Sequence, residues 1–133
     1  MRELAFLNKG LSIILVDKTL RKEKEYRNKY DGGIQEFVEF LDKNKAILVN
    51  KNEVNLFKKP IYISGSKDNV TVECSLKWNA GYSEEMLPFA NNINQKDGGT
   101  HLLGFRSALT RVINKYAIGS NLLKKKQNYT YRR

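Results

Sequence analysis

The sequence predicts a single α+β domain, a two-layer sandwich in which helices cover one face of a sheet. Two helical patterns, at 34–44 and from Gly98 onwards, are separated by β-type patterns between residues 61 and 79. A chain of 133 residues is long enough for one hydrophobic core and too short for two typical domains. The predicted order of elements is strand, weak strand, helix, three strands, helix. A two-layer arrangement is the simplest way to bury the apolar faces of these elements.

The first three elements follow from hydrophobic patterning. Residues 11–18 are rich in β-branched side chains and predict a strand, whereas residues 21–31 are so highly charged that they predict at best an exposed edge strand. Apolar residues then recur at helical spacing and predict a helix that ends near Asn44. These apolar residues are Ile34, Phe37, Val38 and Leu41.

The middle of the chain predicts a loop and an antiparallel meander. Residues 45–59 are polar and lysine-rich and predict a loop, and residues 61–66 predict a strand. Strict alternation of apolar and polar residues over 69–79 predicts a strand with one buried face. Turn-rich segments on both sides of it predict that residues 84–93 form the third strand, with Pro88 at an edge or a bulge.

The last helical pattern runs from Gly98 to about Ala117, with Gly119 as its expected stop. Its apolar stripe consists of Leu102, Phe105, Leu109, Val112, Ile113 and Tyr116. The tail, residues 124–133, has no period and a dense positive charge, so we expect it to be solvated.

Composition favours a polyanionic partner. Twenty-four Lys and Arg against fourteen Asp and Glu give a net charge of +10, which favours nucleic acid, although lysine-rich sequences also gain solubility from their charge. Cys74 is the only cysteine, so an internal disulfide is excluded, and with one histidine a Cys/His zinc site is excluded too. There is no signal-peptide pattern and no apolar run near the ~18 residues of a membrane span. We therefore expect a cytoplasmic chain without membrane contact.

Two Asp-Gly-Gly motifs precede the two helical patterns, and each could be a phosphate cradle, a catalytic loop or a helix start. Neither has the lysine or the spacing of a Walker-type phosphate loop. We interpret both as helix starts, in which the aspartate accepts from free amides or interacts with the positive helix end and the glycines allow a tight turn. The residues assigned to the helix starts are Asp31, Gly32, Gly33, Asp97, Gly98, Gly99 and His101.

The remaining candidate residues do not form an active site. Cys74 lies on the apolar phase of the strand pattern and is expected to be an inert core thiol. Glu84 and Glu85 are adjacent and would point to opposite faces of a strand, which is wrong for a carboxylate pair. On a helical wheel Arg111 lies nearly opposite the centre of the apolar stripe and faces solvent, whereas Arg106 lies at its margin, placed to line a groove edge where it could contact a phosphate. These two arginines are the DNA-facing candidates.

Several segments identify a family. These are "RELAFLNKGLSI", "YDGGIQEFVEFLDKNK", "VECSLKWNAGYSEE" and "NNINQKDGGTH" followed by "GFRSALTR". Together they resemble consecutive segments of the bacterial DNA gyrase B subunit over about residues 2–123. The opening looks more like gyrase than like topoisomerase IV, which is the nearest alternative.

The resemblance implies a domain assignment. In the family this region is the transducer of the ATPase half, with a fold similar to the second domain of ribosomal protein S5, here truncated at its C-terminal end. Residues 1–10 would be the end of the ATPase domain and its connection, residues 11–123 a partial transducer, and residues 124–133 a basic tail without a counterpart.

The resemblance also implies a function, part of an ATP-dependent type II topoisomerase that negatively supercoils DNA. Its implied partners are double-stranded DNA, the gyrase A subunit and a second B subunit. The family's ATP and magnesium site and its Gln-Thr-Lys loop fall outside this sequence, so no catalytic, cofactor-binding or metal-binding residue is expected and the isolated chain should be inactive.

Two alternatives stay open. The chain could be a stand-alone, non-catalytic basic domain that binds nucleic acid or a gyrase subunit, or a degenerate gene remnant whose reading frame breaks at the lysine run. The missing last strand of the family fold would leave an open sheet edge, which favours a homodimer.

Overall fold

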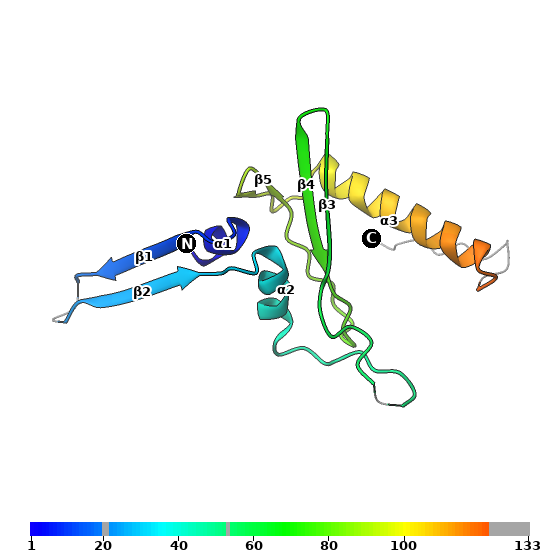
Figure 1. Ribbon diagram of the computed structural model, residues 1–133, viewed down its shortest axis with the longest axis horizontal. Helices are drawn as coiled ribbons and strands as arrows, with labels where there is room; N and C mark the ends of the chain where they lie inside the picture. The colour runs from blue at the N-terminus through cyan, green and yellow to red at the C-terminus, as the bar shows by residue number, and fades with distance from the viewer. Residues whose placement is uncertain (20–21, 53, 123–133) are drawn as a thin grey trace. The chain divides into compact units, whose positions relative to one another are not determined.

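The computed structural model describes residues 1–19, 22–52 and 54–122 (Figure 1). The chain divides into two compact units, residues 1–84 and residues 85–133. Helices and strands are mixed along both units, so the α+β class is confirmed.

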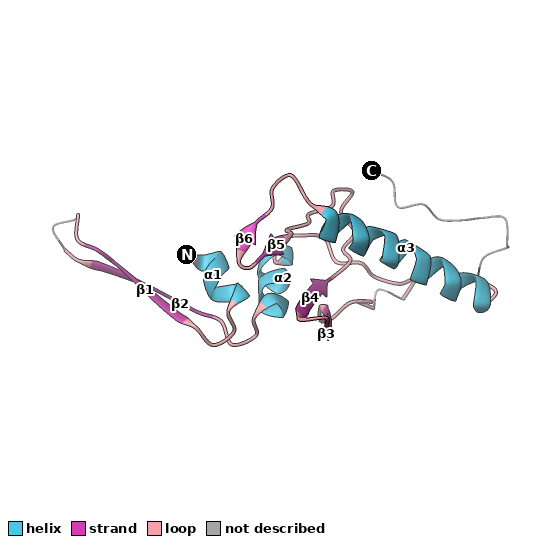
Figure 2. Ribbon diagram, turned by 90° about the horizontal axis from the view of Figure 1, so that it is seen from above, coloured by secondary structure: helices cyan, strands magenta, loops and turns pink. Residues whose placement is uncertain are grey.

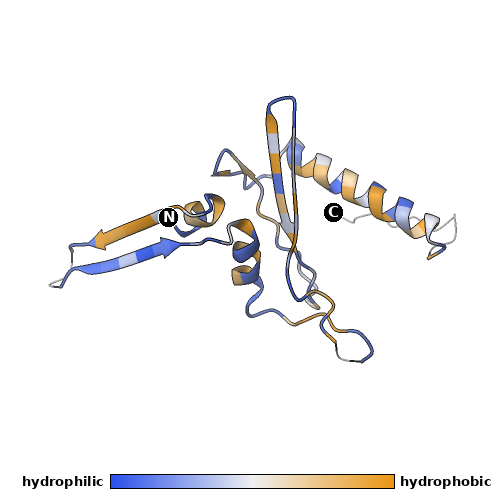
Figure 3. Cartoon of the chain, viewed as in Figure 1, coloured by the Kyte–Doolittle hydropathy of each residue, from blue (hydrophilic) through white to orange (hydrophobic). Residues whose placement is uncertain are grey.

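The first unit opens with a short helix and a two-stranded hairpin. Helix α1 spans Arg2–Leu7, and strands β1 (Ser12–Asp17) and β2 (Lys24–Lys29) pair antiparallel from Ser12↔Lys29 to Asp17↔Lys24. Figure 3 shows β1 as apolar and β2 as mainly hydrophilic. The predictions of a strand at 11–18 and of an exposed strand within 21–31 are confirmed, whereas α1 carries too short a pattern to have been predicted.

Aromatic rings form the core of this unit where α1 meets helix α2 (Ile34–Asp42). The ring of Phe6, which is fully buried, stacks on Tyr30 at 3.5 Å between centroids and on Phe37 at 4.7 Å. Phe37 comes from the apolar stripe of the predicted helix, and the observed bounds of α2 confirm that helix. Aromatic packing of this kind contributes more than its buried area alone.

Strands β3 (Ile61–Lys67) and β4 (Val70–Leu76) form the second hairpin of the unit. They are joined by Asp68 and Asn69, both at positive φ (+50° and +62°), which matches the twist that a two-residue hairpin turn requires. The predicted strands at 61–66 and 69–79 are therefore confirmed in position.

The predicted buried face of β4 is wrong for its first half. Opposite residues such as Ile63 and Cys74 share a face, so the apolar residues of both strands lie on one side. Val70 and Val72 on that side are nevertheless 62% and 58% exposed. Alternation shows which face is apolar, but it does not show whether another element covers that face.

The predicted third strand of the meander is also wrong. Residues 84–88 have no strand, and β5 (Phe89–Ala90) pairs only with β6 (Ile93–Asn94) in the second unit. Asn91 and Asn92 adopt positive φ (+46° and +66°) and close a tight turn inside the segment, so it pairs with itself instead of with β4. The described strands consequently form three separate two-stranded sheets.

Helix α3 (Thr100–Gly119) is the longest element and dominates the second unit (Figure 2). It confirms the predicted helix from Gly98 to about Ala117, and its last residue is the predicted stop, Gly119. That α2 and α3 cover one sheet face stays a prediction, since they belong to different units. The basic tail at 124–133 lies outside the described residues. Within the described residues, no helix is both long and apolar enough to span a membrane.

Candidate functional site

The start of α3 is built by a glycine turn. The backbone N–H of Gly98 donates to the carbonyl of Gln95 at 2.8 Å. Gly98 has φ +80°, a backbone conformation that residues other than glycine rarely adopt. Gly99 is the N-cap residue and its carbonyl accepts the N–H of Leu103 at 3.1 Å. No described side chain caps this helix. The prediction that Asp97 accepts hydrogen bonds from the free amides at the helix start is therefore wrong, and its interaction with the positive helix end stays a prediction.

The start of α2 has the same Asp-Gly-Gly motif, and here a glutamate side chain accepts a hydrogen bond from the residue before the N-cap. Gly33 has φ +60°, and the carboxylate of Glu36 accepts the backbone N–H of Gly32 at 3.0 Å. Asp31 forms an ion pair with Lys29 at 3.3 Å and does not cap the helix. A glutamate three residues after the N-cap is typical of a helix start, and Glu36 could have been predicted from the sequence to take this role.

The other predicted residues do not assemble into a catalytic centre. His101 is exposed in the first turn of α3, and Cys74 is half-buried, which raises the pKa of its thiol. Glu84 and Glu85 lie in an irregular segment, so the argument from opposite strand faces does not apply to them. Within the described residues, no three His, Cys, Asp or Glu side chains are grouped to hold a metal ion.

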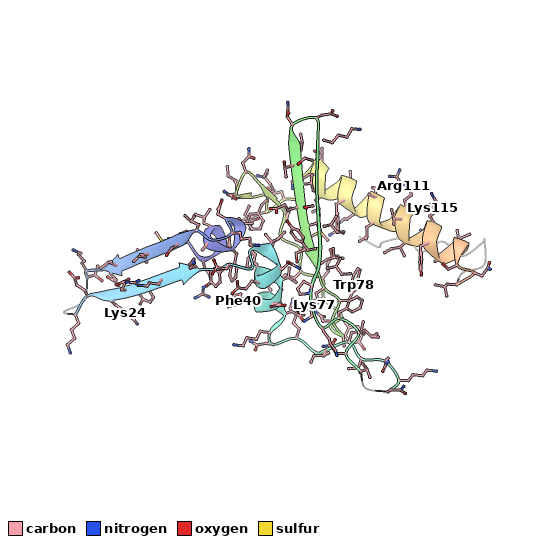
Figure 4. The ribbon with its side chains drawn as sticks, viewed as in Figure 1. Lys24, Phe40, Lys77, Trp78, Arg111 and Lys115 are labelled. Atoms are coloured by element: carbon pink, nitrogen blue, oxygen red, sulfur yellow. The ribbon has the colours of Figure 1, made fainter. Side chains whose placement is uncertain are left out.

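The positive charge of α3 is not balanced by any acidic residue within the helix itself. This helix of 20 residues contains no Asp or Glu, and the whole sequence after Asp97 has none. Arg106 is half-buried, whereas Arg111 is exposed as the helical wheel predicts. Lys115, four residues after Arg111, is exposed too, and Figure 4 shows the two side chains on the same side of α3. The sequence reasoning missed Lys115, although its spacing was visible.

A polar network in the first unit joins the end of α2 to the segment after β4. The ammonium of Lys77 contacts the carboxylate of Asp42 at 2.7 Å, and the Asn79 amide donates to the same carboxylate at 2.9 Å. Burial raises the pKa of Asp42, but the hydrogen bonds from Lys77 and Asn79 lower it more, so the pKa lies below its ordinary value. We call Asp42, Lys77 and Asn79 the Asp42 clamp.

Comparison with solved structures defines the class of protein. The chain is similar to the 43K ATPase domain of Thermus thermophilus gyrase B, solved with an aminocoumarin, with a TM-score of 0.76 and 35% identity over 95% of this chain and 32% of that one. The structure of the gyrase B-subunit of Myxococcus xanthus shares the fold, with a TM-score of 0.69 and 23% identity over 87% of this chain and 30% of that one. The fold is therefore that of a gyrase B ATPase-half segment.

Sequence relatives define the family. The DNA gyrase B family matches residues 33–132. The gyrase B protein of Clostridium acetobutylicum is 50% identical over 88% of this chain and 17% of that protein, and the gyrase B protein of Streptococcus pneumoniae is 45% identical over 93% and 18%. The chain belongs to the DNA gyrase B family, and it spans less than a fifth of these curated relatives.

Proposed function

We propose that this chain is the transducer region of a gyrase B protein, which relays the nucleotide state of an ATPase domain to a DNA gate. In this assignment residues 1–10 are the connection from the ATPase domain, residues 11–123 the partial transducer and residues 124–133 a basic tail. The observation that supports a gyrase B segment is the family match over residues 33–132, which runs across the proposed boundary at 123/124, together with the likeness to a gyrase ATPase-domain structure.

The complete machine would be a type II topoisomerase that acts in the cytoplasm. It would negatively supercoil double-stranded DNA, using ATP and magnesium, together with a gyrase A subunit and a second B subunit. This sequence has no Gln-Thr-Lys segment, the loop to which the family resemblance assigns a part in ATP hydrolysis, so the isolated chain is expected to be inactive. The comparisons do not favour a stand-alone binding domain.

The residues of the region would have different roles. The two Asp-Gly-Gly segments and His101 set the starts of α2 and α3, because their glycines allow backbone turns that position each helix. Arg106 and Arg111 on the acid-free helix α3 would face DNA and contact phosphates without reading sequence.

A segment exchange tests the relay. The matched segment of about 118 residues in the Clostridium acetobutylicum relative is replaced by the corresponding residues of this chain, and the hybrid is assembled with gyrase A. We expect ATP-dependent supercoiling with DNA-stimulated ATP hydrolysis. A hybrid that folds and hydrolyses ATP but does not supercoil would contradict the proposed relay.

DNA contact is tested on the same hybrid with Arg111→Gln. Each lost phosphate contact should reduce the slope of log K against log salt by about one. Lys96→Gln, at an exposed position outside α3, is the charge-matched control. An unchanged slope in Arg111→Gln would remove this residue from the DNA-facing set.

A further inference from the structure

The connection between α2 and β3 is unusually long. Residues 43–60 contain neither helix nor strand where they are described, apart from one isolated bridge, and in Figure 1 this connection extends away from α2 and the β3–β4 hairpin. Connections longer than about 12–15 residues without regular structure are uncommon in compact domains and are usually either functional segments or linkers. The predicted loop is confirmed, but neither its length nor its content is explained by the relay function.

Its first end is fixed to the unit. Asp42, the last residue of α2, is held in the Asp42 clamp, and the backbone N–H of Ala80 donates to the carbonyl of Ala46 at 2.9 Å. The connection therefore leaves the helix along a defined path.

Its second end is fixed as well. Pro60 is buried just before β3, and the amide of Gln35 donates to its carbonyl at 3.5 Å. The ring of Phe57 packs against Trp78 with 5.2 Å between centroids. Figure 4 shows Trp78 beside Lys77 of the clamp, so both ends of the connection are held at the same end of β4.

The described residues between the two ends are held together by a bridge and by hydrogen bonds. Val49 and Asn55 form an antiparallel bridge, and the N–H of Asn50 donates to the carbonyl of Val54 at 3.0 Å. The side-chain oxygen of Asn50 also accepts the backbone N–H of Val54 at 3.0 Å. A segment ordered before binding loses less conformational freedom when it binds, so it binds more tightly than a flexible loop of the same composition.

Both faces of this bridged segment carry exposed aliphatic side chains. Because Val49 and Asn55 lie opposite each other, Ile47 and Val49 share one face, whereas Val54 and Leu56 share the other. All four are between 46% and 57% exposed. Both faces therefore offer apolar area to a partner. We call these four residues the aliphatic ribbon.

The charge around the aliphatic ribbon selects the partner's chemistry. Residues 43–60 contain five lysines and one acidic residue, Glu53. Lys51 near the tip and Lys58 at the base are both exposed. A nucleic-acid backbone would match the lysines but would leave the aliphatic side chains uncovered. This segment also has no arginine, the side chain that binds a phosphate through two parallel hydrogen bonds.

We propose that the aliphatic ribbon, with Lys51 and Lys58, is a docking surface for an acidic protein segment that carries aliphatic side chains. The partner's aliphatic side chains cover the half-exposed aliphatic side chains of the ribbon, and its carboxylates face the lysines. Charge complementarity of this kind speeds association and excludes basic partners, while the apolar contact lengthens the lifetime of the complex.

Peptide binding by the full chain tests the proposal. The probes are two fluorescent peptides, one of alternating Glu and Val and one of alternating Lys and Val, measured by anisotropy. We expect the Glu-Val peptide to bind at least about tenfold more tightly, with an affinity that falls as salt rises. The double variant Val49→Ser with Leu56→Ser should weaken it at least about tenfold, and Lys51→Gln with Lys58→Gln should flatten the salt dependence.

The control is Val70→Ser with Val72→Ser, because these exposed valines of the same unit lie outside the ribbon. Circular dichroism establishes that each variant folds. Equal binding of the two peptides, or equal losses in ribbon and control variants, would overturn the proposal. Two further probes, phosphatidylglycerol vesicles and a DNA duplex, are measured with the same variants. A ribbon-dependent signal on either of them without one on the Glu-Val peptide would also overturn it.

Discussion

Breaking the Asp42 clamp by removing one charge should destabilise the first unit strongly. The side chains of Asp42 and Lys77 are only 9% and 15% exposed, and the short Asp42 side chain cannot bring its charge back to water without moving the end of α2 that carries it. Removing one partner of a fully buried ion pair costs about 3–5 kcal/mol, but Asp42 and Lys77 are only part-buried, so we expect about 1–3 kcal/mol here. This is a large part of a typical domain's stability.

The two single variants should differ. Lys77→Met leaves a part-buried carboxylate without its cation at the last residue of α2, where the negative end of the helix opposes it. Asp42→Asn leaves the lysine charge, but its flexible stem lets the ammonium move toward water, so this variant should cost less. The double variant buries no charge and should cost only about 1 kcal/mol, which makes it more stable than Lys77→Met.

Urea unfolding followed by tryptophan fluorescence measures these differences. Trp78 is the only tryptophan, lies next to Lys77 and packs on Phe57, so its emission reports on this unit. The free energies of unfolding of the four proteins form a double-mutant cycle. A double variant that loses as much as both single variants together would refute the clamp, because it would mean that the two charges do not interact.

Three other perturbations have outcomes that the same structure determines. The pKa of Asp42 is lowered in the fold, so the stability that its charge contributes is fully present above its unfolded pKa of about 4 and is lost as pH falls through the lower folded value. The difference in free energy of unfolding between wild type and Lys77→Met should therefore narrow below about pH 4, as measured by urea unfolding at several pH values. Gly33→Ala should cost about 1–3 kcal/mol because φ there is +60°, whereas Gly65→Ala, at ordinary φ with open space around it, should be nearly neutral; equal unfolding midpoints would contradict this. Burial raises the pKa of the Cys74 thiol, so at pH 8 it should react with a thiol reagent several-fold more slowly in the folded chain than in urea, and equal rates would be inconsistent with that shift.

The elements that sequence predicted well are those specified locally. Helix α2 and helix α3 carry their apolar spacing within their own residues, and β1 carries its β-branched run, so their positions follow from periodicity. Strand pairing is not local. The segment at 84–93 had the composition of a meander strand, but the Asn91-Asn92 turn made pairing within the segment the shorter closure.

Candidate residues show the same division. Arg111 was placed on the exposed side of its helix because a helical wheel needs only spacing. The Asp42 clamp could not be predicted, since Asp42 and Lys77 are far apart in sequence and only the packing of α2 on β4 brings them together. The exposure of Val70 and Val72 was missed for the same reason, because burial depends on what covers a face.

Unbalanced positive charge occurs on helix α3 and in residues 43–60, and the accompanying side chains separate their roles. On α3 the basic residues Arg111 and Lys115 lie near Ser107 and Gly104, a hydroxyl donor and a small residue that lets a phosphate approach. Around the aliphatic ribbon the lysines lie among half-exposed aliphatic side chains, which a phosphate backbone cannot cover. Equal charge therefore does not imply equal partners: in the two proposals above, α3 would contact DNA and the aliphatic ribbon would contact a protein segment. A DNA duplex should compete with the Glu-Val peptide only weakly, and competition as strong as self-displacement would mean that both bind one surface.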